Sequence, residues 1–329
     1  MRLPVAEGGV RAPLSNTPAL SSSPLTKPQR RFAVFAWGVL VYNVAVILWG
    51  ALVRATGSGA GCGGHWPLCN GAVVPNVSQI ATVIELTHRV MSGIALVAVV
   101  AMFVWSRRAF PQGHAARRWS SWALVLILTE ALLGASLVLL GHVARNESVG
   151  RVYSLGTHLI NTFLLLASLA LAARSATQPA PRRGWLFSLS MLGPLIALVL
   201  VAVAGVITAL GDTLFPSHSL AQGMRDDFSS TASFLIRLRI IHPFLALVAG
   251  FVVALVAFPE YKARRTAQLR ALSGGMLVLF GLQFVVGASS ILLQAPLPIQ
   301  LLHLLLADAL WITLVLFTAA QASEERPGL

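Results

Sequence analysis

The sequence has few charged residues: Asp, Glu, Lys and Arg make up 11% of its 329 residues, whereas they make up about 25% of an ordinary soluble domain. In their place, 56% of the residues are hydrophobic, and the mean hydropathy is +0.77. These values exclude a soluble globular protein and indicate a membrane protein. Because one membrane-spanning helix takes about 20 apolar residues, a chain of this length fits about eight spans. We therefore expect an all-α, polytopic bundle.

Acidic residues are especially scarce, with 11 Asp and Glu against 24 Lys and Arg, which gives a formal net charge of +13. A basic protein can bind nucleic acid, but no basic block with interleaved aromatic residues occurs, so we expect no nucleic-acid partner. The Lys and Arg residues lie between the apolar segments and mostly on one side of the expected membrane. The positive-inside rule therefore predicts a multi-pass protein of the cell membrane with both termini in the cytoplasm. The expected spans are residues 32–53, 80–104, 119–140, 154–173, 185–210, 234–258, 271–293 and 298–320.

The spans divide the chain into two halves. Residues 1–31 are rich in Pro, Ser and Ala and carry no apolar stripe, which predicts a disordered cytoplasmic tail. Four spans then form an N-terminal half at 32–173. After a cytoplasmic linker at 174–184, four more form a C-terminal half at 185–320, and residues 321–329 are a second cytoplasmic tail.

The two halves share landmarks at nearly constant offsets, which is typical of an internal duplication. Because four spans separate the copies, both have the same orientation in the membrane, and we predict two four-helix bundles related by a parallel repeat. The landmark pairs are Gly50 and Gly205, His88 and His242, the Gly-Ala-Ser triplets at 134–136 and 287–289, and His158 and His303.

Four histidines lie within the expected spans, where ionisable residues indicate function. Each follows the outer end of an even-numbered span by a few residues, so the four form one layer about 7–14 Å deep in the outer leaflet. A lone histidine would more often pack helices together, but two pairs at equivalent positions favour a haem iron with two imidazole ligands in each half. A zinc or copper site would need three or four convergent ligands, and each half offers only two histidines at this depth.

Charged residues near the histidines distinguish the two halves. Glu85 precedes His88 by three positions and shares its helix face, which makes it a candidate catalytic carboxyl group. The second half has Arg239 at the equivalent position, so we expect one reaction site and one spectator or electron-relay site. Arg89, Arg237 and Arg239 are candidate contacts for haem propionates. The alternatives are that Glu85 is a structural partner of Arg89 or Arg54, and that the arginines snorkel to the membrane interface.

Two further acids lie at membrane depth. Glu130 corresponds to Gln283 in the repeat, four residues before each Gly-Ala-Ser triplet. This position predicts a hydrogen bond that packs helices together. Asp308 has no expected role.

Only two cysteines occur, Cys62 and Cys69, which flank Gly-Gly-His-Trp-Pro-Leu in the first outer loop. In an oxidising compartment they can form a disulfide, which would close a cap over the first haem site. Binding of copper or zinc together with His65 is the alternative, although only this one further ligand is in view.

These motifs resemble the haem A synthase family. The resemblance covers about residues 32–320, and one departure is that Pro243 follows His242 where the family often has a His-Arg pair. The motifs are GALVRATGSG at 50–59, the cysteine loop with WPLCNG at 66–71, ELTHR at 85–89, and the histidines at 158, 242 and 303.

The resemblance implies an eight-span oxidoreductase that converts the C8 methyl group of haem O to the formyl group of haem A by successive hydroxylations. Haem A is the prosthetic group of terminal oxidases. The resemblance also implies that His88 and His158 hold haem O as substrate and that Glu85 serves the oxidation. His242 and His303 would ligate a haem b cofactor.

Other functions share some of these features. A di-haem membrane cytochrome b that only carries electrons would use the same histidines, but it would not need Glu85 or the cysteine loop. A transporter is compatible with a parallel repeat, although no span is broken by paired Gly and Pro at its middle. Membrane lipid, an unidentified electron donor and haem O synthase are the expected partners, and the sequence leaves a homo-oligomer open.

Overall fold

The computed structural model describes every residue except 1–25, 74, 77, 179–188, 265 and 324–329. The described part is helical, apart from loops and one isolated β-bridge between Cys69 and Ala72. Its long helices are α1 (Lys27–Ala55), α2 (Ile80–Ala109), α3 (Ala115–Leu139), α4 (Val149–Ser175), α5 (Leu189–Leu214), α8 (Ile241–Ala263), α9 (Ala267–Leu292) and α10 (Leu297–Ser323). Its short elements are η1 (Ser58–Ala60), α6 (Leu220–Asp227), α7 (Phe234–Arg237) and η3 (Leu238–Ile240).

Eight segments of the described chain are long and apolar enough to cross a membrane. Their lengths of 23 to 30 residues give about 35–45 Å at 1.5 Å per residue, which exceeds a hydrocarbon core of about 30 Å. One of these segments, Phe234–Ala263, joins α7, η3 and α8. The prediction of an all-α, multi-pass membrane protein with eight spans is thus confirmed.

The first helix begins earlier than predicted, at Lys27 rather than at residue 32. Thr26 caps it, because its hydroxyl accepts from the backbone N–H of Gln29 while the Gln29 side chain accepts from the backbone N–H of Thr26. This reciprocal pair satisfies two of the free N–H groups at the helix start. Only residues 1–25 of the expected tail remain beyond the helix, and they lie outside the described residues.

Two other helices extend past the predicted ends of the two halves, residues 173 and 320. α4 continues to Ser175 and α10 to Ser323. Residues 179–188, which include most of the expected linker, and residues 324–329 of the expected tail lie outside the described part of the chain.

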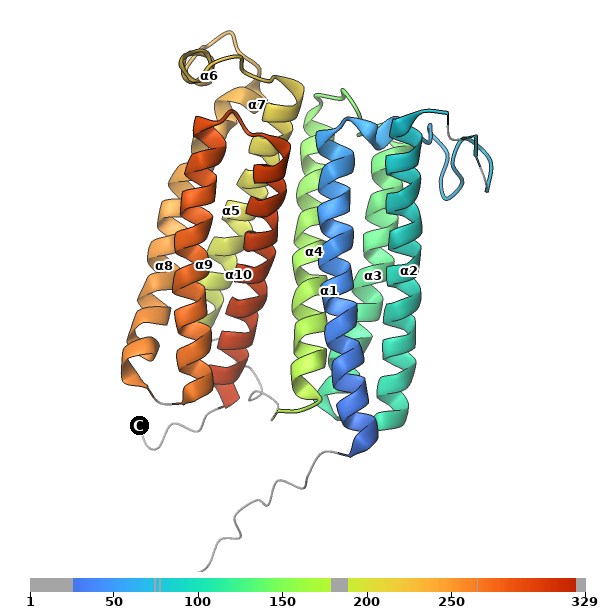
Figure 1. The fold of residues 1–329 in the computed structure, drawn as a ribbon, viewed down its shortest axis with the longest axis vertical. Helices are drawn as coiled ribbons and strands as arrows, with labels where there is room; N and C mark the ends of the chain where they lie inside the picture. The colour runs from blue at the N-terminus through green and yellow to red at the C-terminus, as the bar shows by residue number, and fades with distance from the viewer. Residues whose placement is uncertain (1–25, 74, 77, 179–188, 265, 324–329) are drawn as a thin grey trace, which may run out of the picture.

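The long helices form two groups of four, which stand side by side in Figure 1. Helices α1 to α4 contact one another in the N-terminal half, and α5, α8, α9 and α10 do so in the C-terminal half. Contacts of α1 and α4 with α5 and α10 join the two groups. The grouping agrees with the expected halves, whereas the duplication itself stays a prediction.

Helix α4 lies at this boundary and is the most enclosed of the eight spans, with 61% of its most apolar window buried inside the protein. Where α4 meets α10, the rings of Phe163 and Trp311 stack with their centroids 4.8 Å apart. The indole N–H of Trp311 donates to the Phe163 carbonyl oxygen at 2.7 Å. Stacking and hydrogen bonding together tie the two halves at this point.

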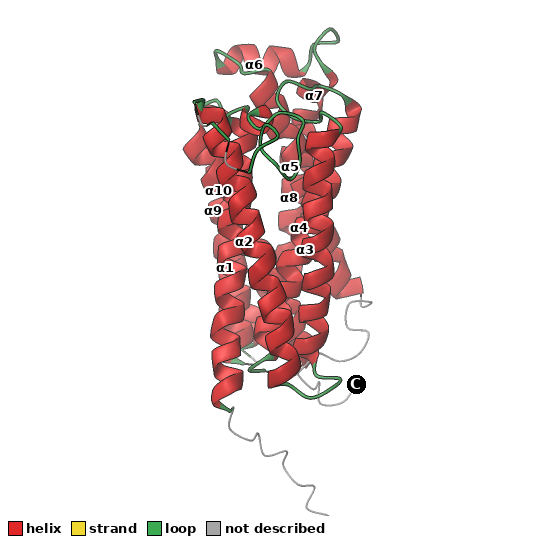
Figure 2. Cartoon of the chain, turned by 90° about the vertical axis from the view of Figure 1, so that its right-hand side faces the viewer, coloured by secondary structure: helices red, strands yellow, loops and turns green. Residues whose placement is uncertain are grey.

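The connections at one end of the bundle carry the short helices and the cysteine loop. Figure 2 shows α6, α7 and several long loops at this end, which we call the loop end. The start of α1 and the end of α10 both lie at the opposite end of the bundle. This placement agrees with both expected tails on one side of the membrane, and the side itself stays a prediction.

A second tie between the halves lies at the loop end. Arg54, in the last turn of α1, donates to the Ala209 carbonyl oxygen at 2.6 Å and to the Thr213 hydroxyl at 2.7 Å, both in α5. It also donates to Gln300 Oε1 of α10 at 3.1 Å. One guanidinium from the N-terminal half therefore binds two helices of the C-terminal half.

Candidate functional site

All four intramembrane histidines lie near the loop end of their helices. His88 follows Ile80, the first residue of α2, by eight positions, and His158 follows Val149, the first residue of α4, by nine. The other two histidines lie in α8 and α10, close to their starts. The four residues are partly exposed. They lie together at one end of the bundle, as the predicted histidine layer requires, and their depth in a membrane stays a prediction.

Three of the four rings pack directly over a glycine of a neighbouring helix. A Cβ atom added to Gly50 of α1 would lie 3.0 Å from His88 Cε1, and one added to Gly205 of α5 would lie 2.9 Å from His242 Cε1. The same addition at Gly287 of α9 would come within 3.0 Å of His303 Cε1. These glycines let an imidazole approach the facing backbone, which explains why glycine recurs at these positions.

The C-terminal pair has the spacing that two ligands of one iron require. The ring centroids of His242 and His303 are 6.2 Å apart, and the ring planes differ by 83°. Two imidazoles that share a metal at nitrogen–metal distances of about 2 Å place their centroids about 6 Å apart. His242 Nδ1 lies 3.0 Å from the Val201 carbonyl oxygen. If Nδ1 carries the proton that this bond needs, Nε2 is left as a free acceptor for a metal.

The N-terminal pair also offers free nitrogens. His88 and His158 lie close enough for their charges to interact. His88 Nδ1 is buried and has no hydrogen-bond partner among the described residues. His158 Nδ1 lies 3.1 Å from Glu130 Oε1, at an angle that departs from an ideal hydrogen bond. Among the described residues, no group of three or more His, Cys, Asp and Glu side chains could hold a metal ion, so both pairs fit a haem iron with two imidazole ligands better than a metal ion with four ligands.

Glu85 is buried, with 3% exposure, and is bound by the cysteine loop. It accepts from the backbone N–H of Cys62 at 2.8 Å, and it forms an ion pair with Arg89 at 2.5 Å. Cys62 and Cys69 are joined in a disulfide. The predicted disulfide is therefore present, and it removes both thiols from the alternative of a copper or zinc site with His65.

Arg89 fixes the same loop from the other side of the ion pair. Its guanidinium donates to the carbonyl oxygens of His65 and Leu68, each at 2.7 Å. The loop, Arg89 and Glu85 therefore form one connected unit at the loop end of α2. The alternative partner weighed for Glu85, an ion pair with Arg89, is the one that the structure contains.

The arginine of the second half is also paired. Arg239 contacts Asp212 and Asp227, each at 2.8 Å. These ion pairs, like that of Arg89, disfavour the predicted propionate contacts of Arg89 and Arg239, since both cations already have a carboxylate partner. Arg237 is exposed and makes no ion pair within the described chain, so its predicted propionate contact stays a prediction.

Sequence reasoning missed the contact between Glu130 and His158. Glu130 was expected to pack helices together, and it does accept hydrogen bonds from Asn161 and Thr162 of α4. Its additional position beside a histidine of the site could have been suspected from Gln283, since the repeat places both at equivalent points. Asp308 is completely buried, and neither carboxyl oxygen has a hydrogen-bond partner among the described residues.

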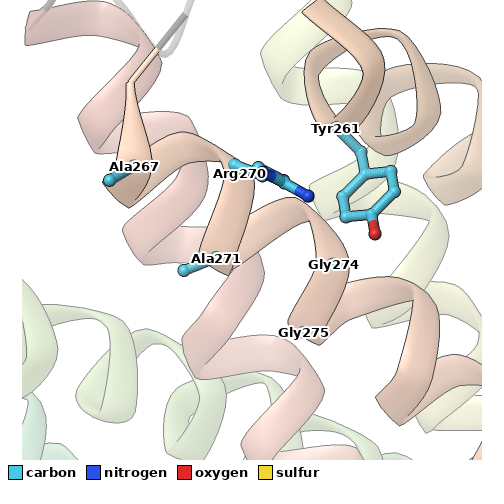
Figure 3. Close-up of a pocket in the computed structure, with 6 residues that line it drawn as sticks. All are labelled: Tyr261, Ala267, Arg270, Ala271, Gly274 and Gly275. Atoms are coloured by element: carbon cyan, nitrogen blue, oxygen red, sulfur yellow. The ribbon is translucent and has the colours of Figure 1, made fainter. Parts of the chain in front are cut away.

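One surface hollow lies away from the histidines. It measures about 470 Å³ and lies between the end of α8 and the start of α9, at the opposite end of the bundle from the histidine layer. Figure 3 shows Arg270 facing the ring of Tyr261 above the small residues Gly274 and Gly275. The hollow contains none of the predicted site residues, so the histidine layer remains the candidate site.

The chain is similar in sequence to several known proteins. A protein of Thermus thermophilus named protoheme IX farnesyltransferase is 45% identical over 297 residues, which are 89% of this chain and 49% of that protein. A heme A synthase of Bacillus mycoides is 26% identical over 82% of this chain and 87% of its own length. Another, of Alkalihalophilus pseudofirmus, is 41% identical over 32% of this chain and 34% of its own length.

The chain thus spans about half the length of the Thermus relative. The family described as cytochrome oxidase assembly protein, COX15-CtaA, matches residues 33–315, which include all eight spans almost completely. A match of this extent, together with the two heme A synthases, shows that the chain belongs to the haem A synthase family of cytochrome oxidase assembly proteins.

Proposed function

We propose that this protein is a haem A synthase, which oxidises the C8 methyl group of haem O to a formyl group. The observation that carries the proposal is the difference between two otherwise similar histidine pairs. Beside His88 lies a buried carboxyl group, Glu85, held under a disulfide-closed loop. The corresponding arginine of the other half, Arg239, is neutralised by two aspartates.

The N-terminal half would hold the substrate. His88 and His158 would ligate the iron of haem O, and Glu85 lies on the same face of α2 as His88, about 5–6 Å away between Cβ atoms. The conversion of a methyl to a formyl group removes two hydrogens, adds one oxygen atom and withdraws four electrons. Successive hydroxylations give an alcohol and then a geminal diol, which loses water. Glu85 would serve as the polar group beside the reacting methyl carbon, and the cysteine loop would restrict access of water.

The C-terminal half would hold a resident haem b between His242 and His303. Haem b supplies one-electron transfer when it is bound. The protein's own contribution here is to fix both imidazoles, since glycine packing sets the ring positions and the Val201 carbonyl selects the protonated nitrogen of His242. Overall, R–CH3 and H2O give R–CHO, four protons and four electrons, so the reaction requires an oxidant outside this chain, either dioxygen or an electron acceptor, to take up the four electrons.

The remaining proposals concern the surroundings of the enzyme. We place it in the cell membrane, with both termini in the cytoplasm and the histidine layer and cysteine loop toward the outer face. The name of the Thermus relative refers to farnesyl transfer onto protoheme IX, the class of reaction that supplies a farnesylated haem. Haem O synthase is therefore the partner that we propose, and a homo-oligomer stays open.

The competing function is a di-haem cytochrome b that only carries electrons, and the similar packing of the histidine pairs favours it as much as it favours the synthase. The two differ in the fate of the substrate. We would express the chain with a source of haem O, purify it in detergent, and identify the extracted haems by chromatography and mass spectrometry. Haem A or its hydroxylated intermediate is expected beside haem b. Haem b alone, with haem O available, would contradict the synthase.

The variant Glu85→Gln tests the assigned role. Glutamine keeps the size of the side chain and can still accept from the Cys62 N–H, but it carries no charge. We expect both haems to stay bound and conversion to stop. Conversion at the wild-type rate would contradict a role for Glu85 in the oxidation.

A further inference from the structure

The carboxyl group of Glu130 in α3 lies beside an imidazole that the proposed function assigns to the substrate haem. Glu130 Oε1 is 3.1 Å from His158 Nδ1, and the two side chains are 18% and 25% exposed. Their partial burial limits screening by water, so the charge of this carboxylate acts on the ring more strongly than a surface charge would. His158 Nε2 stays available on the other side of the ring.

The carboxylate is held in place by groups of the helix that carries His158. Asn161 Nδ2 donates to Glu130 Oε2 at 2.5 Å, and the Thr162 hydroxyl donates to Glu130 Oε1. Asn161 is itself oriented, because its Oδ1 accepts from the Thr129 hydroxyl at 2.6 Å. Asn161, Thr162 and Thr129 thus hold the Glu130 carboxylate beside His158 Nδ1. Packing two helices together would not require so many polar partners for one side chain.

The C-terminal half has a neutral amide at the equivalent position. Gln283 of α9 places its side-chain nitrogen 3.3 Å from His303 Nε2, and its Oε1 has no hydrogen-bond partner among the described residues. An amide carries no charge and cannot stabilise positive charge on the ring as a carboxylate can. The histidines at equivalent positions, His158 and His303, therefore have different polar neighbours.

We propose that Glu130 is a positioning residue that tunes the haem held by His158. Its carboxylate, 3.1 Å from Nδ1, holds a negative charge beside the ring, which favours a ring orientation with Nδ1 toward Glu130 and makes Nε2 a more basic ligand, as carboxylate partners do for metal-bound histidines. A more basic ligand favours ferric over ferrous iron and lowers the reduction potential. Gln283 lies beside the other ring nitrogen of His303, Nε2, and supplies no charge. The inference rests on the ligand assignment of the proposed function.

The test is the variant Glu130→Gln, which gives the first half the side chain of the second. The full chain would be purified with its haems, and each haem would be titrated potentiometrically by its visible spectrum. The haem that is lost in His158→Ala identifies the N-terminal site. We expect Glu130→Gln to raise the midpoint potential of that haem and to leave the other unchanged. An unchanged potential with the haem still bound would overturn the proposal.

Two further variants keep the test decisive. Gln283→Glu should lower the potential of the haem that is lost in His303→Ala, and it decides the matter if Glu130→Gln binds no haem. If Gln283→Glu then leaves that potential unchanged, the proposal is overturned. Ser120→Ala is the control, because it removes another buried polar group of α3 whose hydroxyl only bonds to its own helix. It should shift neither potential.

The outcomes separate this inference from the proposed function. If haem A is formed but Glu130→Gln does not shift the potential, only the tuning role is wrong. If His158→Ala keeps both haems, the ligand assignment is wrong and the tuning role fails with it. If no haem A is formed but Glu130→Gln raises the potential, the tuning role stands in a protein that carries electrons only.

Discussion

The packing of histidine rings over glycines gives a prediction that distinguishes the two haem sites. In Gly50→Ala, the new methyl group would lie 3.0 Å from His88 Cε1, and in Gly287→Ala it would lie 3.0 Å from His303 Cε1. Carbon atoms in good contact are about 3.5–4.0 Å apart. Each ring must therefore move by about 0.5–1 Å, in a direction away from the facing helix.

Such a shift weakens haem binding, because a histidine ligand must hold its ring nitrogen at bonding distance from the iron. Overpacking of this kind costs about 1–3 kcal/mol, and each 1.4 kcal/mol is about tenfold in affinity. We expect haem binding at the affected site to weaken by about 5- to 150-fold, while the other site is unchanged. Gly50→Ala should affect the haem held by His88, and Gly287→Ala the haem held by His303.

Matched controls exist on the same two helices. Gly38 of α1 and Gly281 of α9 are exposed, and a Cβ atom at either position would meet nothing within 4 Å. Gly38→Ala and Gly281→Ala carry the same gain in helix propensity, about 1 kcal/mol, without the clash. The measurement is the haem-to-protein ratio of each purified variant during dilution with a haem-scavenging protein. Equal haem retention in Gly50→Ala and Gly38→Ala would refute the reasoning.

Two further variants test the contacts around the site. In Arg89→Ala, Glu85 loses its partner in a mostly buried ion pair, which costs about 3–5 kcal/mol, and the cysteine loop loses two hydrogen bonds. We expect a lower Tm in detergent and faster proteolysis within the loop. A wild-type Tm and proteolysis rate would show that Arg89 does not hold the loop in place. Arg54→Ala removes three hydrogen bonds between the halves, each worth about 1.5–3 kcal/mol for a charged donor, so its Tm should fall clearly below that of Arg107→Ala, whose bond to Ser121 lies within one half.

The sequence predicts the spans well because lipid imposes a simple rule. A backbone in hydrocarbon must satisfy its own hydrogen bonds, so long apolar runs become helices, and all eight expected runs do so. α1 began earlier than predicted because the capping pair of Thr26 and Gln29 is polar, and polar residues give no hydropathy signal. The short helix α6 was missed for the same reason, since it lies in a polar connection, whereas α7 falls within the predicted span 234–258.

The sequence predicted the four candidate histidine ligands, but it did not predict which side chains contact the charged residues around them. Histidines at repeated positions can be recognised along the chain, and two of the three glycines that face them, Gly50 and Gly205, are themselves a repeat pair. The partner of an arginine depends on tertiary packing: Arg239 binds Asp212 and Asp227, which lie 27 and 12 residues earlier in the chain. The contact between Glu130 of α3 and His158 of α4 likewise depends on how the helices pack. Only the charge of these residues, not their contacts, is visible in the sequence.

The difference in charge between the halves bears on where the reaction occurs. Ionised groups at membrane depth are costly and are usually kept for function. Beside the N-terminal histidines stand two carboxyl groups, Glu85 and Glu130, of which only the first is paired with an arginine. The C-terminal histidines have Gln283 and an arginine already neutralised by aspartates. A protein that only passed electrons between two similar haems would not need this asymmetry, whereas an enzyme that oxidises one haem and retains the other does.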